Sequence, residues 1–135
     1  MSNTGVVEQK VTFKDFVIDV DLPMTQFVSP ASRTTTRLNT DIELSGWAKD
    51  GLGVRAVRVA IFDPDRLLFW NGSEWQSDYV MLNSSLNLWG APDVTWRISF
   101  TPETTSGNVI CYARTVTLDG RYDSRPRILR FSWAK

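Results

Sequence analysis

The residues with the most chemical potential in this chain of 135 residues are aspartates that occur in close pairs. Asp63 and Asp65 flank a proline, and Asp19 and Asp21 alternate near the N-terminus. Paired carboxylates can perform general acid–base catalysis, and the first pair together with Asp50 offers oxygen ligands of the kind that Ca²⁺ prefers. Aspartates at turns and strand ends are more often solvated, and no EF-hand loop is present. We therefore expect neither catalytic residues nor a metal site.

Other catalytic chemistries lack the residues that they need. The chain has no histidine, which excludes a Ser-His-Asp triad and a Cys/His zinc site. Cys111 is the single cysteine, so no disulfide can form within the chain. We predict a protein that is not an enzyme and uses no cofactor.

Six tryptophans suggest carbohydrate binding, because flat aromatic rings stack on sugars. Trp96 and Trp133 occupy apolar positions of alternating segments, which favours the core. Trp70 and Trp75 flank a predicted hairpin turn and are expected to pack across it, with sugar binding as the alternative. Trp47 differs from the others because it shares one side of its segment with polar residues, namely Asp41, Glu43 and Ser45.

Charge and hydropathy narrow the range of partners. The 15 basic and 15 acidic residues balance, so a nucleic-acid partner is not expected, although arginines are frequent toward the C-terminus. No segment approaches the roughly 20 apolar residues of a membrane helix. The first ten residues lack the charged start and apolar run of a secretory signal. We expect a complete, soluble chain that is made in the cytoplasm.

Alternating apolar residues between turn-forming residues predict an all-β chain. The expected strands cover residues 25–28, 41–48, 57–61, 67–70, 94–100, 108–117 and 128–133. About seven strands at roughly 8–12-residue spacing predict a single immunoglobulin-like β-sandwich over residues 23–135. Residues 80–92 show no regular pattern. Residues 1–22 form an extended, strand-like N-terminal arm in this prediction.

The order of four motifs resembles a bacterial and phage immunoglobulin-like or fibronectin-III-like module. They are GWAKDGLGV at 46–54, WNGSEW at 70–75, WRISFTP at 96–102 and RTVTLDG at 114–120. Thr117 stands where the module usually has an aspartate. The resemblance covers about residues 23–135 and implies the fold, but no function, because the module is a generic scaffold.

One strand carries more apolar residues than a solvated sheet needs. If Val109, Cys111, Ala113 and Thr115 face the core, the residues between and after them face outward beside the outward residues of two adjacent strands. These outward rows are Ile110, Tyr112, Arg114 and Val116, then Arg58, Ala60 and Phe62, and then Ile128 and Arg130. The result is an apolar patch edged with arginine, which is typical of a protein contact surface. The alternatives are that the arm covers the patch or that the alternation is reversed. The predicted contact residues are Phe62, Ile110, Tyr112, Arg114 and Ile128.

The arm offers a second predicted contact. It pairs either with its own sandwich or with the edge of a neighbour's sheet, where main-chain hydrogen bonds would give affinity. An unpartnered apolar strand would promote aggregation, so a partner surface is expected. The predicted contact residues are Val11, Phe13, Phe16, Ile18 and Val20.

These observations favour a non-catalytic assembly protein. We expect a phage virion component, such as a capsid decoration or cement protein at the virion surface. Its expected partners are capsid or other virion subunits, with self-association as a further option. The alternative is a carbohydrate-binding or adhesion module of a larger extracellular surface protein.

Overall fold

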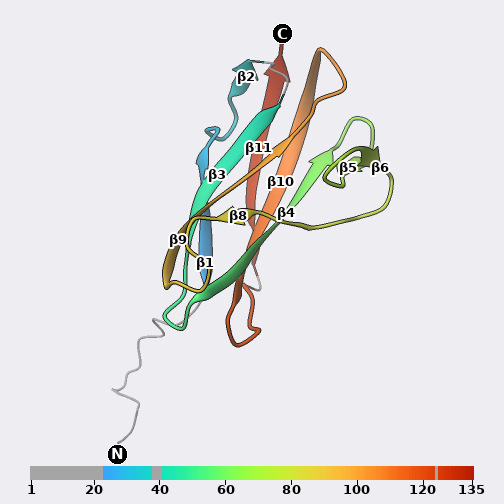
Figure 1. Ribbon diagram of the computed structural model, residues 1–135. Coiled ribbons are helices and arrows are strands. Elements are labelled where there is room, and N and C mark those ends of the chain that lie inside the picture. The colour runs from blue at the N-terminus through green and yellow to red at the C-terminus, as the bar shows by residue number, and fades with distance from the viewer. Residues whose placement is uncertain (1–22, 38–40, 124) are drawn as a thin grey trace, which may run out of the picture.

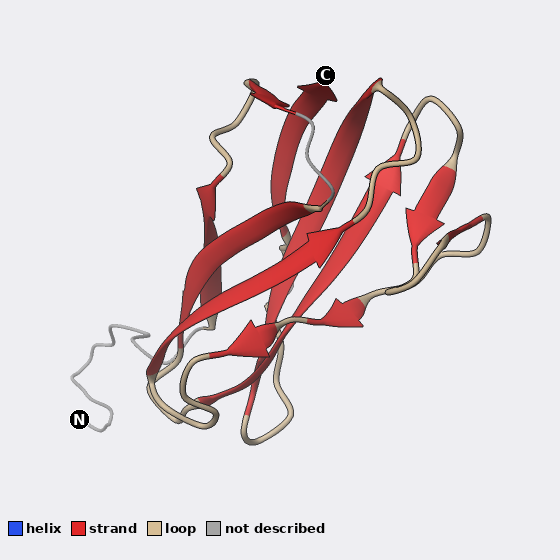
Figure 2. Cartoon of the chain, turned by 45° about the horizontal axis from the view of Figure 1, so that its top comes forward, coloured by secondary structure: helices blue, strands red, loops and turns tan. Residues whose placement is uncertain are grey.

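The computed structural model describes residues 23–37, 41–123 and 125–135, which form strands joined by turns and loops (Figure 2). The first sheet has the order β1 (Met24–Ser29), β3 (Ile42–Lys49), β9 (Asp93–Phe100), β8 (Ser85–Leu86). The second has the order β2 (Thr35–Arg37), β11 (Arg127–Ala134), β10 (Ser106–Thr117), β4 (Val54–Asp63), β5 (Leu68–Trp70), β6 (Trp75–Gln76), and β7 (Leu82–Asn83) also pairs with β4.

The two sheets pack face to face (Figure 1). The spatial order of the strands matches that of an immunoglobulin domain. The order β1-β3-β9-β8 corresponds to its A-B-E-D sheet, and the order β11-β10-β4 corresponds to its G-F-C sheet. The predicted all-β, immunoglobulin-like sandwich is therefore confirmed. Within the described residues no helix is long and apolar enough to cross a membrane.

The structure contains four short strands that the sequence pattern did not predict: β2, β6, β7 and β8. Each has two or three residues, which is too short for alternation to be recognised. β7 and β8 lie within residues 80–92, where no regular pattern was found.

The core is built from the inward residues of both sheets. Phe100 contacts three other core aromatic rings, with ring centroids 5.8 Å from Trp75, 5.9 Å from Trp133 and 6.4 Å from Phe131. Trp96 and Trp133 are 2% and 1% exposed, which confirms their predicted place in the core. Tryptophan has the largest side chain and buries the most apolar surface, so these two residues contribute strongly to the stability of the sandwich.

Gly46 allows β1 and β3 to pack closely around a core tryptophan. A Cβ atom at this position would lie 2.0 Å from the carbonyl oxygen of Gln26 and 2.6 Å from the ring of Trp96. No side chain fits there without a shift of the backbone, which explains why glycine interrupts the apolar row of β3.

Candidate interaction surfaces

Strand β10 alternates between buried and half-buried side chains. Val109, Cys111 and Ala113 are buried in the core, while Ile110 and Tyr112 are half-buried on the outer face of the sheet. The outward direction expected from the sequence thus agrees with the burial pattern. A role of these residues in binding stays a prediction.

Register places the outward side chains of four strands side by side. Arg130, Ile110, Phe62 and Phe69 form one row across β11, β10, β4 and β5. In the next row Ile128 lies opposite Tyr112. We call this outer surface the aromatic face, and it consists of Phe62, Phe69, Tyr79, Ile110, Tyr112 and Ile128.

Aromatic contacts extend this surface beyond the long strands. The ring centroids of Phe62 and Phe69 are 4.7 Å apart, and Tyr79 packs edge-on against Phe69 at 5.3 Å. Tyr79 is 64% exposed and Ile128 is 48% exposed, although both belong to an apolar cluster. An exposed cluster of this kind is typical of a contact surface.

The charged residues in the outward rows of β4, β10 and β11 are arginines, and Asp65 reaches this side of β10 at Asn108. Arg58 and Arg114 lie directly opposite each other, and Arg130 stands in the row of Ile110. The outward positions of β4, β10 and β11 include no acidic residue. Like charges that face each other across strands are unfavourable, so an acidic partner would relieve this arrangement. The guanidinium group of Arg114 also lies 4.8 Å from the ring centroid of Tyr122.

A shallow hollow adjoins the same face. Its volume is about 340 Å³, and Arg33, Pro64, Ile110 and Arg130 are among its lining residues. Two arginines beside an apolar wall suit a carboxylate that comes from a partner.

Two residues of the predicted outward rows are buried. Ala60 is fully buried because its methyl group is short and the larger Tyr112 lies opposite it. Val116 is 4% exposed, since the register of β10 and β4 shifts after this residue and Tyr122 forms a bridge with it. Val116 therefore keeps the register of the outward row but adds no exposed apolar surface to it.

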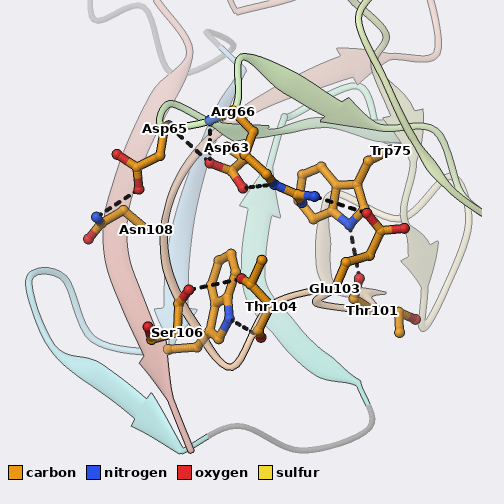
Figure 3. A network of polar contacts seen from close by, with 10 residues as sticks. Asp63, Asp65, Arg66, Trp75, Thr101, Glu103, Thr104, Ser106 and Asn108 are labelled. Atoms are coloured by element: carbon orange, nitrogen blue, oxygen red, sulfur yellow. Dashed lines mark hydrogen bonds and ion pairs between the residues drawn. The ribbon is translucent and has the colours of Figure 1, made fainter.

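The carboxylate of Asp63 has a structural role at one end of the sandwich (Figure 3). It is buried and accepts hydrogen bonds from the backbone N–H groups of Asp65 and Arg66 and from Nε of Arg66 at 2.8 Å. The Asp63 contact raises the pKa of Arg66. Nη1 of Arg66 in turn lies 3.0 Å from Glu103. The network joins the turn after β4 to the loop before β10.

The structure contradicts a calcium site shared by Asp50, Asp63 and Asp65. Asp50 precedes β4 and Asp63 ends it, so about 30 Å of extended strand separates them. Among the described residues no three acidic, histidine or cysteine side chains gather in a way that would hold a metal ion. Asp65 instead accepts a hydrogen bond from the side chain of Asn108 at 3.1 Å.

The tryptophan pair of the hairpin is not a sugar platform. Trp70 and Trp75 are 6% and 9% exposed, and their ring centroids are 5.6 Å apart in an edge-on arrangement. Nε1 of Trp75 donates to the carbonyl oxygen of Thr101 at 2.9 Å (Figure 3). The predicted packing across the turn is confirmed, and the alternative of sugar binding at this pair was wrong because the rings are enclosed.

Thr117 organises the turn at the opposite end. Its hydroxyl group accepts a hydrogen bond from the backbone N–H of Arg121 at 3.0 Å and donates to Asp119. The bonds from Thr117 and then Arg121 lower the pKa of Asp119. Nη2 of Arg121 also lies 3.3 Å from the carboxylate of the buried Asp50. A hydroxyl group thus stabilises the turn at the position where the resembling module has an aspartate.

Sequence reasoning missed an exposed apolar cluster at this end of the sandwich. Hydrogen bonds join the loops there, from Gly90 N to Val54 O and from Leu118 N to Gly53 O. Trp89 is 65% exposed because it lies in a loop within the segment that showed no regular pattern. The other exposed apolar residues of the cluster are Leu52, Leu88 and Leu118.

The arm prediction lies outside the described residues. It concerned residues 1–22, with Val11, Phe13, Phe16, Ile18 and Val20 as contacts.

Comparisons with known proteins leave the function open. No family model matches the chain, and no curated protein matches it significantly. Among solved structures, the chain is similar to the sulfane dehydrogenase SoxCD from Paracoccus pantotrophus, with a TM-score of 0.49 and 15% identity. The match covers 75% of this chain and 23% of that chain, so this chain spans about a quarter of the enzyme chain. A similarity this low carries no argument about function.

Proposed function

We propose that this chain is a non-catalytic attachment protein that binds an acidic, partly apolar surface of a larger protein assembly through its aromatic face. The observation that supports this is the continuous row of Arg130, Ile110, Phe62 and Phe69 across four strands. Tyrosine and arginine are frequent among the residues that dominate binding energies at protein interfaces.

The charge of the face favours a different protein over a second copy of this chain. Two copies that met face to face would bring Arg58, Arg114 and Arg130 of each toward those of the other. A partner with aspartate or glutamate around an apolar centre would instead neutralise the arginines and speed association. The arm would add a second contact, and two linked contacts hold more tightly than either one alone.

The resemblance to phage modules supports a narrower version of this proposal. In this version the assembly is a phage virion, and the chain is a decoration or cement protein on its capsid. The alternative function is that of a surface adhesion module that binds glycans. The test below determines whether the aromatic face has a protein partner.

The proposal is tested by photo-crosslinking from Ile110 in the native source. A photoreactive amino acid at Ile110 is expected to crosslink one predominant protein, a capsid or tail subunit in the virion version. Tyr112→Asp should abolish the product because it places a charge in the apolar centre, and high salt should reduce the yield through screening. Thr105→Asp is the matched control, because it adds the same charge at an exposed loop position.

Two outcomes would contradict the proposal. One is a set of products that is the same from Ile110 as from a photoreactive group at Thr105. The other is a specific product that persists unchanged in a folded Tyr112→Asp variant.

The contribution of the arm is tested separately by removing residues 1–22. The described core lies entirely within residues 23–135, so we expect the shortened chain to fold. We predict that it no longer attaches to its assembly, as measured by co-sedimentation with the purified particle. Normal attachment of the shortened chain would show that the sheet face is sufficient.

A further inference from the structure

A hollow of about 490 Å³ lies on the opposite side of the molecule, on the outer face of the four-stranded sheet. All four strands or their ends contribute to it. A second hollow of about 400 Å³ adjoins the first and shares Glu43, Ser85 and Arg97 with it. It extends past β8 to Trp70, Gly72, Leu82 and Asn83. We call the two hollows together the Trp47 groove, and its principal side chains are Glu43, Ser45, Trp47, Ser85, Thr95 and Arg97.

Strand register explains why these side chains share one surface. Trp47 lies opposite Thr95, while Arg97 lies between Ser45 on one side and Ser85 on the other. Successive residues of a strand point to opposite faces, so every second residue of β3 and β9 faces outward here. Trp47 is the one aromatic side chain among these outward positions of the described β3, β8 and β9.

The indole group of Trp47 is available to a ligand. Its Nε1–H makes no hydrogen bond within the described part of the chain. The corresponding groups of Trp75, Trp96 and Trp133 donate to Thr101, Thr25 and Thr104, and thereby hold core tryptophans in place. The ammonium group of Lys49 lies 5.4 Å from the Trp47 ring centroid. Lys49 is itself exposed, so it does not enclose the ring.

The polar side chains around the ring make few contacts with the rest of the described chain. Arg97 and Glu43 approach to 3.9 Å, and their side chains are 72% and 60% exposed. The hydroxyl groups of Ser45, Ser85 and Thr95 make no hydrogen bond to the described residues. Thr95 is held only through its backbone, whose N–H donates to the side-chain oxygen of Asn87 at 2.8 Å.

We propose that the Trp47 groove binds an oligosaccharide, with one sugar ring stacked on Trp47 and its hydroxyl groups hydrogen-bonded to the side chains around it. The apolar face of a sugar needs one flat ring, and its hydroxyl groups need both donors and acceptors. Arg97 and Glu43 balance in charge, which disfavours nucleic acid. The hydroxyl-rich walls disfavour a lipid, and the length of the double hollow suits more than one sugar unit.

This site is separate from the aromatic face. Its stacking residue Trp47 lies on the first sheet, and the second hollow also reaches Trp70, Leu82 and Asn83 at the edge of the second sheet. None of these residues belongs to the aromatic face. Loss of sugar binding and loss of attachment would therefore follow from different variants.

The test is electrophoresis of the full chain through gels that contain starch, mixed-linkage β-glucan, xylan or polygalacturonate. At least one polysaccharide is expected to retard the chain, and calorimetry with the matching hexasaccharide would give the Kd. Trp47→Ala should weaken binding about tenfold, which is the size of one aromatic contact of about 1.4 kcal/mol. Arg97→Ala should weaken it by a smaller factor. Trp89→Ala removes a more exposed tryptophan from a loop outside the groove and should leave sugar binding unchanged.

Three results would overturn the proposal. They are the absence of retardation by all four polysaccharides, equal weakening by Trp89→Ala and Trp47→Ala, and preferential binding of an oligonucleotide or peptide in the same gels. Thermal melting of each variant establishes that it is folded. If Trp47→Ala were unfolded, Arg97→Ala would decide the question, because this exposed side chain can be removed without loss of core packing.

Discussion

The two outer faces of this sandwich differ although they are built in the same way. On the second sheet the outward positions present Phe62, Ile110 and Tyr112, with arginines beside them. On the first sheet the outward positions present hydroxyl groups, a balanced pair of Glu43 and Arg97, and a single tryptophan. The folded core requires neither arrangement. The difference fits the two proposals, in which the aromatic face binds a protein and the Trp47 groove binds a sugar.

The largest expected effect distinguishes core tryptophan from surface tryptophan within one sheet. Trp96 and Trp47 lie on adjacent strands but on opposite sides, and Trp96 also packs edge-on against Phe27 at 5.4 Å. We expect Trp96→Ala to lower the free energy of unfolding by about 3–5 kcal/mol. Trp47→Ala should lower it by less than about 1 kcal/mol, since an outward side chain leaves no buried cavity. Urea unfolding of both variants measures the difference. Equal losses would show that Trp47 belongs to the core.

The alternation that separates the two sides of each strand was predictable from the sequence. Strand β10 shows this best, because its inward row of Val109, Cys111 and Ala113 fixed the outward direction of Ile110 and Tyr112. The alternation of burial ends at Val116, immediately before the register of β10 and β4 shifts. A bulge depends on contacts between strands, so the pattern of one strand does not reveal it.

The full extent of both surfaces depends on short elements that could not be predicted from the sequence. Tyr79 joins the aromatic face through its contact with Phe69, although it lies outside any strand. The Trp47 groove requires Ser85 from β8, a strand of two residues. The unusual position of Trp47 was visible in the sequence, but the hollow beside it arises from tertiary packing.

The second expected effect concerns the core between the two faces. There the buried Cys111 thiol should make the free energy of unfolding depend on pH. Burial raises the pKa of the Cys111 thiol, so the folded chain keeps its proton. The unfolded chain ionises above about pH 8.5 and then binds fewer protons than the folded chain. The contribution of the thiol to the free energy of unfolding should therefore be nearly constant up to about pH 7.5 and then fall, by about 1.4 kcal/mol between pH 7 and 9.5. Urea unfolding across this range measures the slope.

The matched variant for this experiment is Cys111→Ala, which should remove the part of the slope due to the thiol. A variant slope identical to that of the unmodified chain would show that Cys111 does not set the dependence. In the folded chain the buried thiol should also react slowly with a thiol-specific reagent, and it should react at once in urea.

The smallest expected effect tests whether the aromatic face is adapted to a partner at a cost in stability. Arg58 lies directly opposite Arg114, and Arg58→Glu would replace a repulsive pair with an attractive one. We expect the free energy of unfolding to rise by about 0.5 kcal/mol. Arg97→Glu on the other face would place two acidic groups beside each other and should lower it by a similar amount. Both changes should shrink in high salt, because exposed charges are screened.

The same pair of variants separates stability from binding. Arg58→Glu should reduce the crosslinking yield from Ile110 while it stabilises the chain, since the partner would then meet a negative charge at the border of the face. A variant that is more stable and attaches as well as the original would show that the arginines serve neither purpose. A variant that is less stable would show that Arg58 already has a favourable environment, and the argument for an acidic partner would then rest on Arg130 and its hollow alone.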